Sequence, residues 1–202
     1  MESRLKVLGH PVHPMLVMFP VALLATAVLF DVIDTVGGPD FLGEVAYWNI
    51  TVGLIGGLLA AAAGSFDLLA IPTGTRAKRV GLLHAGANVA VVLLFAAVWV
   101  VRLNADSRAA GGALVAIEVV AVAILGISAW LGGELVDRLG VGVDPDADLD
   151  APSSLRPTAS TVPAGRTGPR SSDLSTGTPM PGDPAADREL HRPDTAGEID
   201  RP

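Results

Sequence analysis

Four long apolar stretches alternate with short polar connections over the first two thirds of the chain. The stretches cover residues 14–33, 46–69, 80–101 and 111–131. A transmembrane α-helix needs about 20 mostly apolar residues, and each stretch has this length. Because short connections favour antiparallel neighbouring helices, the pattern predicts an all-α fold. We expect an integral membrane four-helix bundle with up-down topology over residues 5–143.

The pattern changes after residue 143. The segment 144–202 is rich in proline, serine, threonine, glycine and aspartate, and it has almost no clusters of aromatic or β-branched residues. Such a segment buries too little apolar surface to offset the entropy cost of ordering the chain. We therefore predict a disordered hydrophilic C-terminal tail.

The composition is informative mainly because it excludes several classes of protein and of site. Charged residues make up 17% of the chain, against about a quarter in soluble domains. The absence of cysteine excludes disulfides, thiolate metal sites and cysteine nucleophiles. We find no nucleophile–base pair, no phosphate-binding glycine loop and no basic patch interleaved with aromatic residues. The sequence thus favours a protein that is not an enzyme and does not bind nucleic acid.

Basic residues predict the orientation of the bundle. They flank the first and fourth stretches and fill the second connection, whereas the connection 34–44 has none. The residues concerned are Arg4, Lys6, Arg76, Lys78, Arg79 and Arg138. The third connection, with Arg102 and Arg108, is an exception. Because short loops rich in lysine and arginine stay in the cytoplasm, we expect both termini on the cytoplasmic side of the inner (plasma) membrane. The basic second connection also suits anionic lipid headgroups.

Small residues form a strip on the second predicted helix. Gly53, Gly57, Ala60 and Gly64 follow one another at spacings of three and four, and Asp67 ends the strip. Small residues let membrane helices approach closely. We interpret the strip mainly as a packing seam within the bundle, with a homo-oligomer interface as the alternative.

The first predicted helix begins with two histidines next to prolines. Pro11 and Pro14 restrict the preceding His10 and His13 to extended conformations, so the histidines lie on a stiff turn at the membrane boundary. Pro20 lies inside the helix and is expected to kink it. A structural turn alone would not require histidine twice.

Further polar residues interrupt the apolar stretches. His84 and Asn88 lie one turn apart on the third helix, and Glu118 lies inside the fourth. We favour a hydrogen-bonded structural role for Glu118, with a proton or ligand role as the alternative. The predicted topology brings several of the unusual polar residues to the cytoplasmic side. These are His10, His13, Asp67, His84 and Glu134.

Three sequence blocks resemble one family. They are GHPVHPMLVMFPVAL at 9–23, IPTGTRAKRVGLLHAGAN at 71–88 and GGELVDRLGVGV at 132–143. They are similar to the bacterial membrane family catalogued as domain of unknown function 2231, and the arginine-rich, alanine-rich composition also indicates a bacterial source. The resemblance supports the topology and supplies no activity. By analogy, some relatives are joined to Rieske iron–sulfur domains, which implies a separate redox protein as a partner. The positions that match the family are His10, His13, Arg76, Arg79, His84, Asn88 and Glu134.

Three functions stay open at this point. The first is a redox module that binds haem b, with His84 and either His13 or His10 as axial ligands and Asn88 beside them. The second is a transition-metal or proton site that uses His10, His13, His84 and Asp67. The third, which carries the most weight, is a structural or interaction protein whose polar residues cap and crosslink the helices.

Overall fold

Four long α-helices make up most of the computed structural model, which describes residues 2–105, 108–151 and 153–155 of the chain. The helices are α1 (Val12–Thr35), α2 (Phe41–Ala70), α3 (Arg76–Arg102) and α4 (Gly112–Gly133). Each is long and apolar enough to cross a membrane. The predicted all-α membrane fold is confirmed, and the helix bounds differ from the predicted spans by only a few residues.

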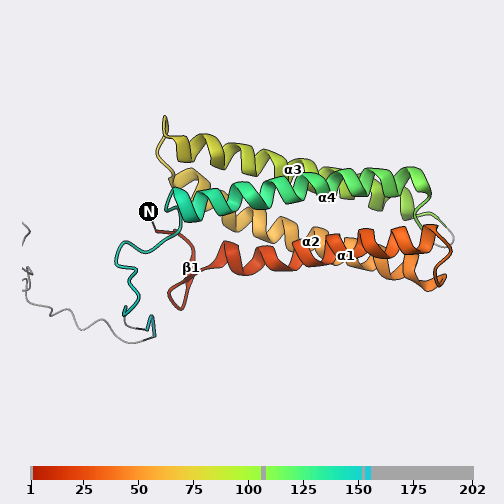
Figure 1. The fold of residues 1–202 in the computed structure, drawn as a ribbon, viewed down its shortest axis with the longest axis horizontal. Coiled ribbons are helices and arrows are strands. Elements are labelled where there is room, and N and C mark those ends of the chain that lie inside the picture. Colours follow the sequence, from red (N-terminus) through yellow and green to blue (C-terminus); the bar gives the residue numbers. More distant parts are fainter. Residues whose placement is uncertain (1, 106–107, 152, 156–202) are drawn as a thin grey trace, which may run out of the picture. The chain divides into compact units, whose positions relative to one another are not determined.

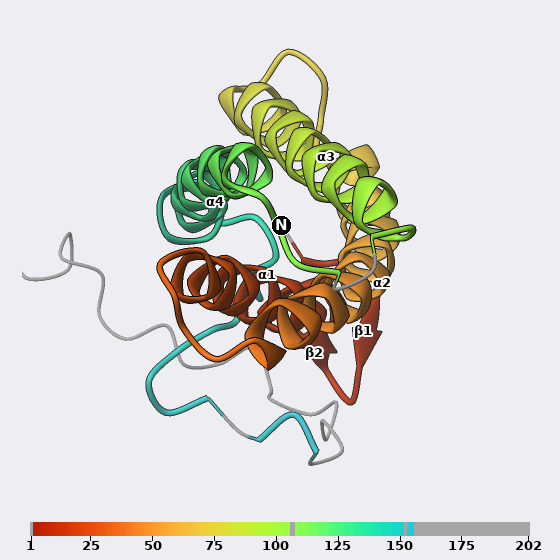
Figure 2. The same cartoon turned by 90° about the vertical axis from the view of Figure 1, so that its right-hand side faces the viewer.

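The helices run up and down beside one another (Figure 1). The N-terminal segment, the α2–α3 connection and the end of α4 lie at one end, which we call the N-terminal end. The α1–α2 and α3–α4 connections lie at the other end, which we call the distal end. Seen along the bundle, the four helices surround a common centre (Figure 2). The most extensive packing is between α1 and α2 and between α3 and α4.

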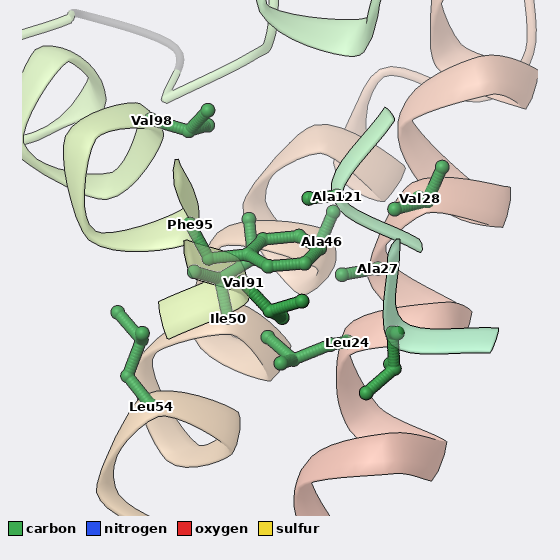
Figure 3. Close-up of a cluster of buried hydrophobic side chains, with 11 residues drawn as sticks. Leu24, Ala27, Val28, Ala46, Ile50, Leu54, Val91, Phe95, Val98 and Ala121 are labelled. Atoms are coloured by element: carbon green, nitrogen blue, oxygen red, sulfur yellow. The ribbon is translucent and has the colours of Figure 1, made fainter. Parts of the chain in front are cut away.

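A buried apolar cluster occupies the middle of the bundle and draws on all four helices (Figure 3). Its members are Leu24, Ala27, Val28, Ala46, Ile50, Leu54, Val91, Phe95, Val98, Ala121 and Leu125. Many large apolar side chains face outward instead, among them Met18, Phe19, Leu58 and Leu93. In lipid such outward apolar surface is expected, so the polar groups that face inward are the informative ones.

The small-residue strip of α2 packs against its neighbours inside the bundle. A Cβ atom added at Gly53 would lie 2.9 Å from Leu24 Cδ2 on α1, and one at Gly57 would lie 3.6 Å from Val92 on α3. Pro20 also contacts this face, because its Cδ would be 3.4 Å from a Cβ atom at Gly56. The predicted packing seam thus lies within the bundle, and α1 continues as a helix through Pro20.

Short elements complete the N-terminal end. The strands β1 (Lys6–Val7) and β2 (His10–Pro11) form an antiparallel hairpin. Its turn has positive φ at Leu8 and Gly9, the backbone geometry of a two-residue hairpin turn. A single π-helical segment, η1 (Glu134–Arg138), follows α4. Of the predicted tail, residues 144–151 and 153–155 are described, and the remainder lies outside the described residues.

Candidate functional site

His13 lies in the first turn of α1, facing α2. The predicted extended conformation is therefore wrong for His13, because the helix begins at Val12, after the extended Pro11, and includes Pro14 in its first turn. Its Nδ1 is 2.8 Å from the carbonyl oxygen of Ala60. Because a carbonyl only accepts hydrogen bonds, Nδ1 donates and carries the ring proton. Gly64, one turn further along α2, leaves room for the ring, since a Cβ atom there would lie 2.9 Å from His13 Cε1. The strip of small residues on α2 therefore also accommodates the imidazole.

His84 is held in a similar way between α3 and α4. Its Nδ1 is 2.8 Å from the carbonyl oxygen of Ser128, so this nitrogen also carries the proton. A Cβ atom added at Gly132 would lie 3.2 Å from His84 Cε1. On the other side of the ring, Asn88 Nδ2 lies 3.1 Å from His84 Nε2 and 3.1 Å from the carbonyl oxygen of His84. Every polar atom of the imidazole thus has a partner.

The two imidazoles meet inside the bundle. The ring centroids of His13 and His84 are 6.4 Å apart, and the ring planes are almost perpendicular, at 89°. We call these residues the histidine pair. A backbone carbonyl fixes the Nδ1–H tautomer of each ring, so Nε2 is the acceptor atom of each. The Nε2 atom of His84 accepts a hydrogen bond from Asn88. The sequence analysis predicted both residues as candidate ligands, but a sequence alone cannot show that they approach each other.

The other predicted ligands lie elsewhere at the N-terminal end. His10 is exposed on β2, with its Nδ1 3.1 Å from the carbonyl oxygen of Leu8. Asp67 accepts hydrogen bonds from Ser3 Oγ at 2.8 Å and from the backbone nitrogen of Arg4 at 2.7 Å. Asp67 therefore anchors the N-terminal segment to α2. Among the described residues, no group of three or more histidine, aspartate or glutamate side chains could hold a metal ion.

The basic residues of the second connection join the helix ends. Arg76 forms an ion pair with Glu134 of η1, and Lys78 Nζ donates to the carbonyl oxygen of Leu68 at 2.7 Å. Arg79 is exposed one turn into α3. Nearby, Lys6 Nζ donates to the Glu2 carboxylate at 2.9 Å, and this hydrogen bond raises the pKa of Lys6. The contacts of Arg76 and Lys78 thus connect the start of α3 to η1 and to the end of α2.

A second polar centre, which the sequence analysis did not assemble, lies near the distal end. Asp31 of α1, Arg102 of α3 and Glu118 of α4 have fully buried side chains. We call them the charged cluster. Arg102 binds Asp31 through two hydrogen bonds, of 2.7 and 3.0 Å, and Glu118 Oε1 through one of 3.1 Å. It also donates to the carbonyl oxygens of Gly43 and Arg108.

The expected depth of these three residues in the membrane is the sequence feature that could have grouped them. Asp31 and Arg102 lie in the last turns of α1 and α3, and Glu118 lies in the second turn of α4. In an up-down bundle, these positions fall at a similar depth near the same end. A buried arginine also requires an acidic partner. The three residues come from three different helices, so the pattern within any one helix does not show that they meet.

Four membrane-length helices with polar centres in their interior define a multi-pass helical membrane protein. The family described as "Predicted membrane protein (DUF2231)" matches residues 9–145, and the chain belongs to this family. The matched region includes the histidine pair and the charged cluster. No curated protein and no solved structure matches the chain.

Proposed function

We propose that the protein is a membrane redox module that binds one haem b, with His13 and His84 as the axial ligands. The observation that carries the proposal is the histidine pair itself. Two imidazoles from different helices approach each other between the helices of the bundle, and each has Nε2 as its unprotonated ring nitrogen. Bundle interiors commonly supply axial histidines in this way.

The separation of the two rings is compatible with both binding one iron, provided that the Nε2 atoms turn towards it. A metal–imidazole bond is about 2.0–2.1 Å long, so two imidazoles on opposite sides of one ion have ring centres roughly 6 Å apart. The centroids of His13 and His84 are 6.4 Å apart. Carbonyl groups on Nδ1 orient both rings and increase the basicity of Nε2, as they do for metal-bound histidines generally.

The neighbouring glycines support the same proposal. Gly64 on α2 and Gly132 on α4 each lie against one ring, where any side chain would collide with it or narrow the space beside it. A bound haem would supply one-electron chemistry. The protein's own contribution would be the two ring nitrogens and the backbone contacts that orient them.

The proposed orientation places the histidine pair near the cytoplasmic surface. We infer that the N-terminal end, with both termini and the basic second connection, faces the cytoplasm from the inner membrane. Six basic residues in or beside this end support it: Arg4, Lys6, Arg76, Lys78, Arg79 and Arg138. A separate redox protein that exchanges electrons with the haem would then dock on this side.

One observation favours a different function for the same pair. Asn88 Nδ2 donates to His84 Nε2, so His84 already has partners on both ring nitrogens. In this alternative the histidine pair is a hydrogen-bonded proton or structural site, and no iron binds. Iron binding at His84 requires Asn88 to turn away from Nε2 while it keeps its bond to the carbonyl oxygen of His84. A site for a transition metal without haem has less support, because only two ligands meet.

The optical spectrum of the full-length protein, purified in detergent from cells supplied with haem precursor, tests the proposal. We expect a Soret band whose reduced form shows the sharp visible bands of six-coordinate haem b. His13→Ala and His84→Ala should each lose that six-coordinate spectrum. His10→Ala is the matched control, because His10 is exposed on the hairpin, and it should leave the spectrum unchanged.

A preparation without a Soret band, even after incubation with haemin, would contradict haem binding. Elemental analysis of that preparation for zinc, copper and iron then separates the remaining two functions. Bound metal that His84→Ala removes would indicate a metal site, and metal-free protein would favour the hydrogen-bonded pair.

A further inference from the structure

The charged cluster uses every donor of one arginine. A guanidinium group has five N–H donors. In Arg102, Nε donates to the carbonyl oxygen of Arg108 at 2.7 Å, and Nη2 donates to Asp31 Oδ1 and to the carbonyl oxygen of Gly43. The two donors of Nη1 reach Asp31 Oδ2 at 2.7 Å and Glu118 Oε1 at 3.1 Å. No donor of Arg102 is left for another acceptor.

The second carboxyl oxygen of Glu118 has no hydrogen-bond partner among the described residues, although it is fully buried. A buried acceptor without a donor costs about 1–3 kcal/mol, and more if it is charged. In contrast, both oxygens of Asp31 are bound by the arginine in the bidentate geometry that stabilises an ionised carboxylate. The two acids therefore differ in how well the structure supports a negative charge.

The net charge of the cluster also disfavours the ionisation of both acids at once. Two ionised carboxylates beside one guanidinium group would leave a net negative charge in a fully buried site, which is expensive inside a membrane protein. Asp31 Oδ2 and Glu118 Oε1 bind the same nitrogen of Arg102, so the two carboxyl groups are close together. Like charges at this separation disfavour each other. One bound proton removes the excess charge.

We propose that Glu118 is a proton-binding site, which carries one proton on its carboxyl group at neutral pH while Asp31 stays ionised against Arg102. The proton converts the unpartnered Oε2 from an acceptor into a donor, and the nearby Asp31 carboxylate can accept from it. The cluster is then neutral, with one cation, one anion and one carboxylic acid. This site is separate from the histidine pair and does not depend on haem binding.

Among the described residues, Arg102 is the only cation that forms an ion pair with Glu118. On α1, Asp34 adds negative charge, because its Oδ2 lies 3.2 Å from the position that a Cβ atom of Gly43 would take. On α2, the contact is the carbonyl oxygen of Gly43. In the α3–α4 connection, Arg108 contacts the cluster through its backbone carbonyl, while its guanidinium group lies 4.6 Å from the ring centroid of Tyr47.

Infrared spectroscopy of the full-length protein in detergent at neutral pH tests the proposal. A protonated carboxyl group in an apolar site gives a carbonyl stretching band well separated from those of carboxylates and amides. We expect such a band, and we expect it to shift when the protein is labelled with ¹³C-glutamate. Glu118→Gln, which keeps the shape of the neutral acid, should remove it. Glu134→Gln is the matched control and should not, because Glu134 is paired with Arg76 at the other end of the bundle.

A third variant tests the charge balance. In Asp31→Asn, Glu118 becomes the one acid that can neutralise Arg102, so it should release its proton and the glutamate band should disappear. Persistence of the band in Asp31→Asn would overturn the assignment of the charges. Absence of a ¹³C-glutamate-sensitive band from the unmodified protein would overturn the proposal. This measurement on the unmodified chain needs no variant, so the proposal stays testable even if Glu118→Gln does not fold.

Discussion

Individual buried polar side chains affect the stability of this bundle because few other hydrogen-bond partners are available to them inside a membrane protein. Arg102 shows this most clearly, since its five donors connect Asp31, Glu118 and two backbone carbonyl groups from four parts of the chain. Breaking a buried ion pair from one side is more costly than replacing the pair as a whole, because the remaining charge keeps its desolvation cost. The arginine should therefore dominate the stability of the distal end.

We predict that Arg102→Leu lowers the free energy of unfolding by about 3–5 kcal/mol, the usual cost of removing one partner from a buried ion pair. Denaturant unfolding in detergent, followed by circular dichroism, measures this change.

The matched control is Arg138→Ala. Its side chain is 76% exposed and lies 3.7 Å from Glu134, so the change should cost about 0–1 kcal/mol. Equal stability of the two variants would mean that the charged cluster does not hold the distal end together.

At the scale of helices, α2 determines how closely the bundle packs. Its small residues were predicted to form a packing seam, and the structure places them against α1, against Val92 of α3 and against the ring of His13. In lipid, apolar surface gains little from leaving the acyl chains, so association depends on close contact. One strip therefore both packs helices and accommodates an imidazole of the histidine pair.

We predict that Gly53→Ala destabilises the bundle by about 1–3 kcal/mol, the usual cost of overpacking. The added methyl group would lie 2.9 Å from Cδ2 of Leu24, which is only 2% exposed and has little room to move. The midpoint of unfolding in detergent reports the effect.

Gly86→Ala on α3 provides the comparison. Nothing lies within 4 Å of its added Cβ atom, so the change should be neutral or stabilising by up to about 1 kcal/mol through helix propensity. If both alanines had the same effect, close approach at Gly53 would not be what limits packing.

At the scale of the whole molecule, the two ends of the bundle differ in their chemistry. The N-terminal end holds the histidine pair, the hairpin and most of the basic residues that the structure describes, whereas the distal end holds the charged cluster. If the N-terminal end faces the cytoplasm, a proton on Glu118 lies nearer the outer surface and the proposed haem lies nearer the inner one. The orientation therefore decides which compartment each centre serves.

Cysteine labelling in intact cells tests this orientation, because the chain contains no cysteine of its own. Asp40→Cys and Thr73→Cys place one exposed thiol at the distal and the N-terminal end, respectively. We predict that a membrane-impermeant maleimide labels position 40 in intact cells and labels position 73 only after permeabilisation. The reverse pattern would overturn the proposed orientation.

Much of the fold could be predicted from the order of residues alone. The four apolar stretches predicted four membrane helices, because a length of about 20 apolar residues is a requirement of the bilayer and not of any tertiary contact. The spacing of Gly53, Gly57 and Gly64 predicted a packing strip, because helical periodicity places those positions on one face. His13 was identified as a candidate from the prolines beside it, and His84 from its position in an apolar stretch.

The meeting of side chains from different helices required the tertiary structure. Helical periodicity gives the face of a residue within its own helix, but the rotation of each helix about its axis is set by packing with all its neighbours. This rotation joins His13 to His84 and directs Asp67 to Ser3. It also brings one arginine and two acids from three helices together in one buried site. There the five donors of a single guanidinium group bind both carboxyl oxygens of Asp31 but only one of Glu118.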